Sequence, residues 1–144
     1  MITPVFKWGQ SEDNILIWVK MSHKIDVPGC LDIKDSSLTF EKNLMKFVVN
    51  CMQANQPLEF RLELLLNDDL HHKKATWKKD SVGTGIITIP KNTDGMIIRD
   101  LLHKNFKKPP NMKVQVWWEL KNAHKKAMEE YERIIFDEED DWDL

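Results

Sequence analysis

The sequence predicts an all-β fold, a seven-stranded antiparallel β-sandwich, followed by an α-helical extension. Apolar and polar residues alternate along the first ninety residues with the period of two that a half-buried strand requires. Turn-forming residues interrupt this pattern at short intervals, and the apolar spacing becomes helical only after Pro90. The 144 residues suit one domain with its own core, since 42% are hydrophobic and 31% are charged.

The clearest strand covers residues 58–66, where every second side chain is apolar and Glu59, Arg61 and Glu63 lie between them. The same alternation predicts strands over residues 15–19 and 45–51. Shorter β-rich runs cover residues 5–8, 31–33, 38–40, 76–78 and 86–89. Turn or breaker residues separate the runs at 10–14, 27–29, 35–37, 54–57 and 83–85. We count seven or eight strands without a helical pattern between them, which is typical of an antiparallel sandwich or barrel.

The residues that follow the strands predict two helices and a link. A short helix is expected to begin at a cap on Thr93 or Asp94 and to end near Asn105. Pro109 and Pro110 then impose an extended conformation. The expected regions are the sandwich (residues 1–92), the short helix and proline-rich link (93–110), an amphipathic helix (111–136) and an acidic tail (137–144).

The expected helix over residues 111–136 has one apolar stripe. Its members are Trp117, Leu120, Ala127, Tyr131 and Ile134. Trp117 and Trp118 are neighbours and cannot face the same surface, so one of them is expected to pack on the sandwich. The stripe also offers a seam through which two chains could form an oligomer.

Charge is distributed unevenly along the chain. Residues 129–144 hold nine acidic residues and one base, Arg133, while the rest of the chain holds twenty bases and fourteen acids. An acidic tail on a basic body indicates either a tail that folds back or two faces for different partners. Trp142 lies in this tail without core residues around it, so we expect it either to be unstructured or to anchor a partner.

No motif supplies a nucleophile, a base and a stabilising group together, so we expect no enzyme, no catalytic residue and no cofactor. His71 and His72 are adjacent and would point to opposite sides of a strand, which favours a solvated loop over a metal site. Cys30 and Cys51 are interpreted as buried free thiols rather than a disulfide. Free thiols favour a reducing compartment, and we expect a cytoplasmic location.

Lysines are grouped at residues 73–74, 78–79, 104, 107–108 and 125–126, which raises the question of nucleic acid. The arginines are not clustered and the isoelectric point is about 6.2, so nucleic-acid binding is not expected. A solvated face or a contact surface for an acidic protein remain as interpretations. No apolar run is long enough to cross a membrane.

Several of these runs, taken in order, resemble the CS domain. The carriers are Phe6-Lys7-Trp8-Gly9-Gln10, residues 14–19, 31–33 with 38–40, and 58–64, then Trp77 and residues 85–91. The CS domain is the sandwich shared by NudC-like proteins, by a small cytosolic co-chaperone of heat-shock protein 90 and, more remotely, by small heat-shock proteins. Family members often continue with a Trp-x-x-Leu element, whereas this chain has Ile98-Arg99-Asp100-Leu101 without the tryptophan.

The resemblance implies a seven-stranded sandwich that binds a chaperone or its clients and needs no cofactor. By position, Lys104, Phe106, Lys107 and Lys108 match the stretch that meets the chaperone, and Trp142 lies in what looks like a shortened acidic tail. These residues are the predicted partner-binding site. The function implied is a non-enzymatic co-chaperone of heat-shock protein 90. The alternative is a NudC-like holdase or scaffold for client or motor-associated proteins.

Overall fold

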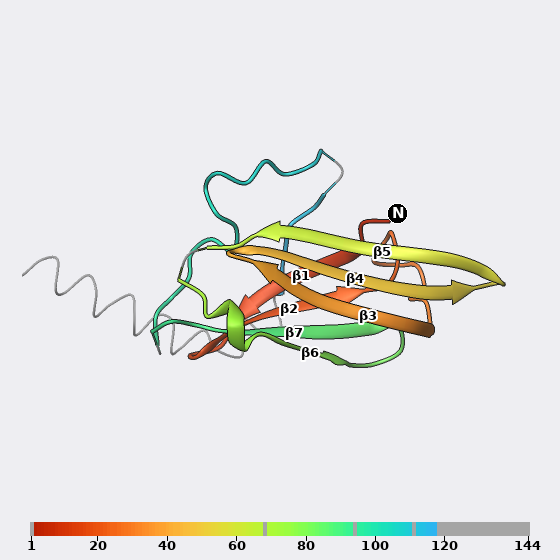
Figure 1. The fold of residues 1–144 in the computed structure, drawn as a ribbon, viewed down its shortest axis with the longest axis horizontal. Coiled ribbons are helices and arrows are strands. Elements are labelled where there is room, and N and C mark those ends of the chain that lie inside the picture. Colours follow the sequence, from red (N-terminus) through yellow and green to blue (C-terminus); the bar gives the residue numbers. More distant parts are fainter. Residues whose placement is uncertain (1, 68, 94, 111, 118–144) are drawn as a thin grey trace, which may run out of the picture.

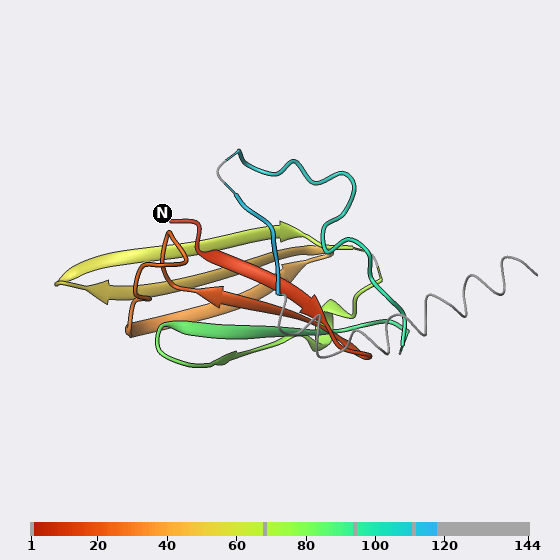
Figure 2. The same ribbon diagram turned by 180° about the vertical axis from the view of Figure 1, so that it is seen from behind.

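A computed structural model describes residues 2–67, 69–93, 95–110 and 112–117, and within them the chain folds as two packed β-sheets (Figure 1). The strands are β1 (Val5–Gln10), β2 (Asn14–Lys20), β3 (Asp32–Glu41), β4 (Leu44–Gln53), β5 (Gln56–Leu65), β6 (Thr76–Lys79), β7 (Thr84–Pro90) and β8 (Gln115–Val116). One sheet has the order β6-β7-β2-β1-β8 and the other the order β3-β4-β5. Figure 2 shows the molecule turned by 180°, with the five-stranded sheet toward the viewer. The predicted all-β sandwich is confirmed.

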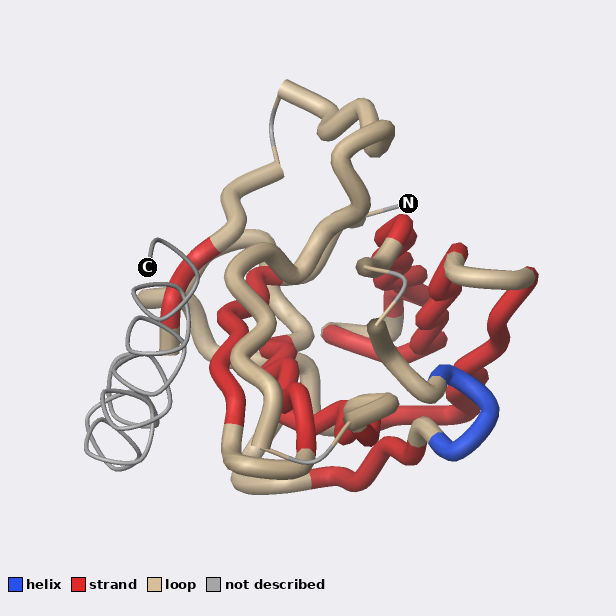
Figure 3. The backbone as a smooth tube through the Cα atoms, turned by 90° about the vertical axis from the view of Figure 1, so that its left-hand side faces the viewer, coloured by secondary structure: helices blue, strands red, loops and turns tan. Residues whose placement is uncertain are grey.

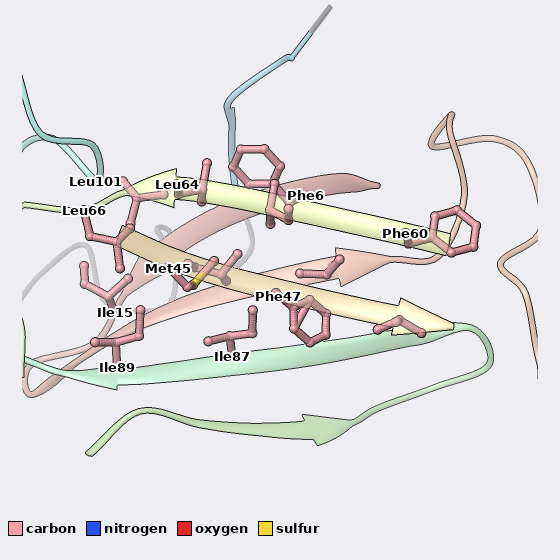
Figure 4. Packing of buried hydrophobic residues seen from close by; sticks show 14 of the residues in the cluster. Phe6, Ile15, Met45, Phe47, Phe60, Leu64, Leu66, Ile87, Ile89 and Leu101 are labelled. Atoms are coloured by element: carbon pink, nitrogen blue, oxygen red, sulfur yellow. The ribbon is translucent and has the colours of Figure 1, made fainter. Parts of the chain in front are cut away.

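The core lies between the sheets. It contains the side chains that the alternation of apolar and polar residues placed on one face of each strand. Ile15, Ile17 and Val19 of β2 are fully buried, as are Met45 of β4 and Leu62 of β5. Figure 4 shows side chains of both sheets in this core, among them Ile15 of β2, Ile87 of β7 and Met45 of β4. Burying one such aliphatic side chain contributes about 1.5–3 kcal/mol, so this dry interior supplies most of the stability.

Strand β3 corrects one detail of the sequence reading. Residues 32–33 of the first run and the run at 38–40 belong to a single strand, and Asp35-Ser36-Ser37 does not break it. The register against β4 shifts between Ile33 and Asp35, so a bulge takes up the one extra residue, Lys34, and Asp35, Ser36 and Ser37 pair with Asn50, Val49 and Val48. The eight predicted runs therefore form seven antiparallel strands, to which β8 adds a parallel pairing with β1.

The expected short helix between Thr93 and Asn105 is wrong for the described residues, which run in irregular conformation there. Ile98 and Leu101 are buried against the sandwich, and an irregular backbone lets both reach it. The single described helical turn is the 3-10 turn η1 (His72–Lys74), the blue segment in Figure 3. No described helix is long and apolar enough to cross a membrane.

The expected helix over residues 111–136 does not begin at its predicted start. Residues 112–117 form no helix, and Gln115 and Val116 pair with β1. Residues 118–136 and the acidic tail, including Trp118 and Trp142, lie outside the described residues.

The prediction of two free thiols is wrong, because Cys30 and Cys51 form a disulfide with their Cα atoms 6.5 Å apart. Both residues are buried, as predicted, at 2% exposure. Cys30 lies between β2 and β3, where its backbone N–H donates to Met21 O at 2.9 Å, and this pairing turns it toward β4. The bond therefore depends on how the loop crosses the end of the sandwich, which residue spacing does not reveal.

Candidate protein-binding surfaces

Gln10 fastens the segment that follows the last sandwich strand. Its side-chain Nε2 donates to Ile98 O at 2.8 Å, and its Oε1 accepts from Ile98 N at 2.9 Å. The amide thus satisfies both backbone groups of a buried residue across 88 positions of sequence. Ile98 and Leu101 begin and end the stretch that the resemblance compared with a Trp-x-x-Leu element, and they are 2% and 1% exposed.

Lys91 holds the same segment from the other side. Its ammonium donates to Ser11 O at 2.8 Å and also to Met96 O, and the residue is only 5% exposed. Burial lowers the pKa of Lys91, and the nearby carboxylates of Asp13 and Glu12 oppose that shift. Gln10 and Lys91 together fix where the chain leaves the sandwich toward the predicted contact residues.

The predicted contact residues lie on the loop that leaves this fastened segment and projects beyond β5 (Figures 1 and 3). Lys104, Lys107 and Lys108 are exposed, and Phe106 is half-buried against the core. Phe106 and Lys107 line one hollow of about 380 Å³, beside Arg61 and Glu63 of β5, whereas Lys104 and Lys108 do not line it. The structure therefore brings together two of the four described residues of this prediction.

A second surface, which the sequence analysis did not single out, lies at the free edge of β3. A hollow of about 640 Å³ is lined there by Leu38, Phe40, Lys42, Asn43, His72, Lys73 and Ala75. The rings of Phe40 and His72 form one wall, with centroids 5.6 Å apart. Leu38 and Phe40 were visible as a β-rich run, but only the sheet order shows that they face η1 across an open edge.

The backbone along this edge is open as well. Glu41 pairs with Leu44 across a two-residue turn, so alternate residues of β3 direct their N–H and C=O groups away from β4. By this register the outward groups belong to Ser36, Leu38 and Phe40. Within the described part of the chain, these groups have no hydrogen-bond partner. The edge thus combines unpaired backbone groups with an apolar hollow.

Trp77 of β6 closes one end of this groove. Its indole Nε1 donates to Ser36 Oγ at 3.1 Å, and its ring meets Phe47 edge to face at a centroid distance of 4.8 Å. Gly85 on the neighbouring strand leaves room for the ring, because a Cβ at this position would overlap it. The open part of the groove therefore extends from Leu38 toward the β3–β4 turn.

The described residues contain no group of three or more histidine, cysteine or acidic side chains placed to hold a metal ion. The groove beside β3 combines an apolar wall with two lysines and an unpaired strand edge. Such surfaces are suited to contact a polypeptide.

No protein-family model matches this chain, and no curated protein matches it in sequence. Solved structures of small heat-shock proteins do match its fold. For hspA from Xanthomonas axonopodis the TM-score is 0.52 at 13% identity, covering 65% of this chain and 98% of that protein. For heat shock protein 16.0 from Schizosaccharomyces pombe the TM-score is 0.52 at 10% identity, covering 72% and 100%.

A small heat-shock protein from Xylella fastidiosa has a TM-score of 0.50 at 15% identity, covering 71% of this chain and 97% of that one. At these identities the likeness concerns the fold. The chain therefore has the β-sandwich fold of small heat-shock proteins, to which the CS domain is related. The sandwich predicted from the CS-domain resemblance is confirmed at this level.

Proposed function

We propose that this protein is a non-enzymatic, chaperone-type binding module that holds extended segments of unfolding client proteins along the free edge of β3. The observation that supports the proposal most is the unpaired backbone of Ser36, Leu38 and Phe40 beside the apolar hollow. This function corresponds to the NudC-like holdase expected as the alternative from the sequence. The fold shared with small heat-shock proteins is consistent with it.

Binding would proceed by strand addition. An extended client segment pairs its N–H and C=O groups with the outer edge of β3, and every second side chain enters the hollow beside Leu38, Phe40 and Ala75. The backbone bonds are independent of client sequence, whereas the hollow selects apolar side chains. Lys42 and Lys73 line the same hollow and would favour acidic residues that flank the apolar ones.

Suppression of the aggregation of a heat-sensitive model client tests this proposal. We expect Phe40→Ser to weaken client binding about tenfold, because losing an apolar anchor of an interface costs more than about 1 kcal/mol. Val48→Ser is the control, since Val48 is a half-buried apolar residue on the far face of the same sheet. The proposal fails if the wild-type chain does not suppress aggregation, or if both variants suppress it equally well.

Binding to heat-shock protein 90 is the second candidate. It is favoured by the exposed Lys104, Lys107 and Lys108 on a loop that begins at the Gln10 and Lys91 contacts. We expect the chain to bind the ATP-bound chaperone and slow its ATP turnover, and Lys107→Glu with Lys108→Glu to abolish this effect. Lys78→Glu, an exposed lysine on β6, is the matched charge control. Absence of nucleotide-dependent binding at micromolar concentrations would eliminate the candidate.

The cellular location is also open to a direct test. A cytoplasmic location was expected from free thiols, but the Cys30–Cys51 disulfide removes that support because cytosolic disulfides are rare. Alkylation of free thiols in rapidly quenched cells measures whether the bond is present where the protein resides. A cytoplasmic location is supported only if the state of Cys30 and Cys51 measured in the cell agrees with the reducing conditions of the cytoplasm.

A further inference from the structure

The outer face of the five-stranded sheet carries an apolar row. Leu16 and Trp18 of β2 point away from the core, because Ile15, Ile17 and Val19 between them are buried inside. Ile86 of β7 lies directly opposite Trp18 in the register and faces the same way. The three residues, here called the outer apolar row, are half-buried and do not belong to the core cluster.

The outer face of the three-stranded sheet mixes half-buried apolar side chains, among them Leu44, Val48 and Leu65, with charged and polar ones. Arg61 of β5 forms ion pairs there with Glu59 at 3.0 Å and Glu63 at 3.6 Å. Asn50 of β4 donates to Asp35 of β3 at 2.7 Å on the same face. A face of this kind is stable in water, whereas a sheet face with tryptophan, leucine and isoleucine in a row is typical of a surface that another element covers.

The chain itself arrives at the outer apolar row at the end of the described residues. Trp117, directly after β8, donates its backbone N–H to Trp8 O at 2.8 Å. The ammonium of Lys7 lies 4.6 Å from the ring centroid of Trp18 and 5.5 Å from that of Trp117. Both indoles thus share one cation on the outer face of the sheet. This outer face is turned to the viewer in Figure 2.

We propose that residues 118–136 dock as an amphipathic helix on this face and cover the outer apolar row. The apolar residues of the segment share one helical stripe: Leu120, Ala127, Tyr131 and Ile134. A helix of this segment is ~28 Å long at 1.5 Å per residue. The seven-residue strands β2 and β7 are ~23 Å long, so one helix spans the row in full.

Tethering favours this segment over other occupants. A segment attached at Trp117 meets the row at an effective concentration in the millimolar range, which a second copy reaches only at very high protein concentration. The inference is independent of client binding, because the outer apolar row lies on the outer face of the five-stranded sheet, whereas Leu38 and Phe40 lie on the inner face of β3.

Hydrogen–deuterium exchange of the full chain, resolved by peptide, tests the inference. We expect the amides of residues 118–136 to be protected in the wild type at dilute and concentrated protein alike. Ile86→Lys, on the sheet, and Leu120→Asp, on the segment, should each reduce this protection at least tenfold. Val48→Lys is the matched control, because it places the same charge on the outer face of the other sheet.

The amides of β4 report in the same experiment whether each variant is folded, and Leu120→Asp leaves the sandwich itself unchanged in sequence. Exchange of residues 118–136 at unprotected rates in the wild type would overturn the inference, as would protection that survives both Ile86→Lys and Leu120→Asp. Protection that appears only as the protein is concentrated, together with a dimer in sedimentation, would also overturn it and assign the face to a second copy.

Discussion

Replacing Gln10 by Met should detach the segment that follows β7 without changing the volume of the side chain much. The substitution removes both bonds to Ile98 and leaves a buried N–H and a buried C=O without a partner. Each orphaned group costs about 1–3 kcal/mol, and relaxation of the segment recovers part of that cost. We therefore expect the free energy of unfolding to fall by about 2–4 kcal/mol.

Urea unfolding measures the loss, and hydrogen exchange locates it. The amide of Ile98 should exchange at least about a hundredfold faster. A hundredfold change in an equilibrium constant is two factors of ten and corresponds to about 2.7 kcal/mol. Amides of the β4–β5 ladder should follow only the global change. Gln53→Met is the control, because it makes the same replacement at an exposed position at the end of β4. A loss below about 1 kcal/mol with unchanged exchange at Ile98 would refute the assigned role of Gln10.

Three further predictions concern other contacts of the sandwich. Reducing the Cys30–Cys51 bond, which closes a loop with a separation of 21 residues, should lower the free energy of unfolding by about 3 kcal/mol in urea titrations, and the double serine variant should not respond to reductant. The folded-state pKa of Lys91 is lowered, so the unfolded chain binds more protons than the folded chain between that pKa and 10.5. The free energy of unfolding of the wild type, minus that of Lys91→Met, should therefore rise with pH in this window, and a flat difference in urea unfolding at several pH values would contradict this. Gly85→Ala should cost about 1–3 kcal/mol by thermal unfolding because its methyl group overlaps Trp77, and the cost should shrink in a Trp77→Ala background.

Much of the fold could be predicted because period-two patterns state which side chains face inward. Ile15, Ile17 and Leu62 were assigned to inner faces from alternation alone, and all three are fully buried. The pattern does not show which strands pair with each other or in which register. The bulge that joins residues 31–33 to 38–40 depends on the register against β4, and the polar residues at 35–37 looked locally like a turn.

The candidate sites were harder to predict, because they depend on which segments the topology brings together. Phe106 and Lys107 were named from a family resemblance and do line one hollow. The groove at Leu38 and Phe40 was missed, since its other wall comes from residues more than thirty positions later, around His72. The short helix expected after Pro90 failed for a related reason. The amide of Gln10 satisfies the backbone of Ile98 across the sandwich, and this long-range contact overrides local helix signals.

The way the chain treats its sheet edges supports β3 as the binding edge. The edge of β5 is paired at both ends. Ile2 donates to Glu59 O at 2.8 Å and accepts from Arg61 N at 2.9 Å at one end. His103 donates to Leu65 O at 2.8 Å at the other. The edge of β1 is covered by β8, and β6 is a four-residue strand that ends in two lysines. Short, charged or covered edges are how proteins prevent unwanted strand pairing. Among the described edge strands β3 is long, its bulge and most of its charged residues lie at 32–35, and the stretch from Ser36 to Phe40 stays open beside an apolar hollow. The open edge beside the groove is consistent with the strand addition proposed above.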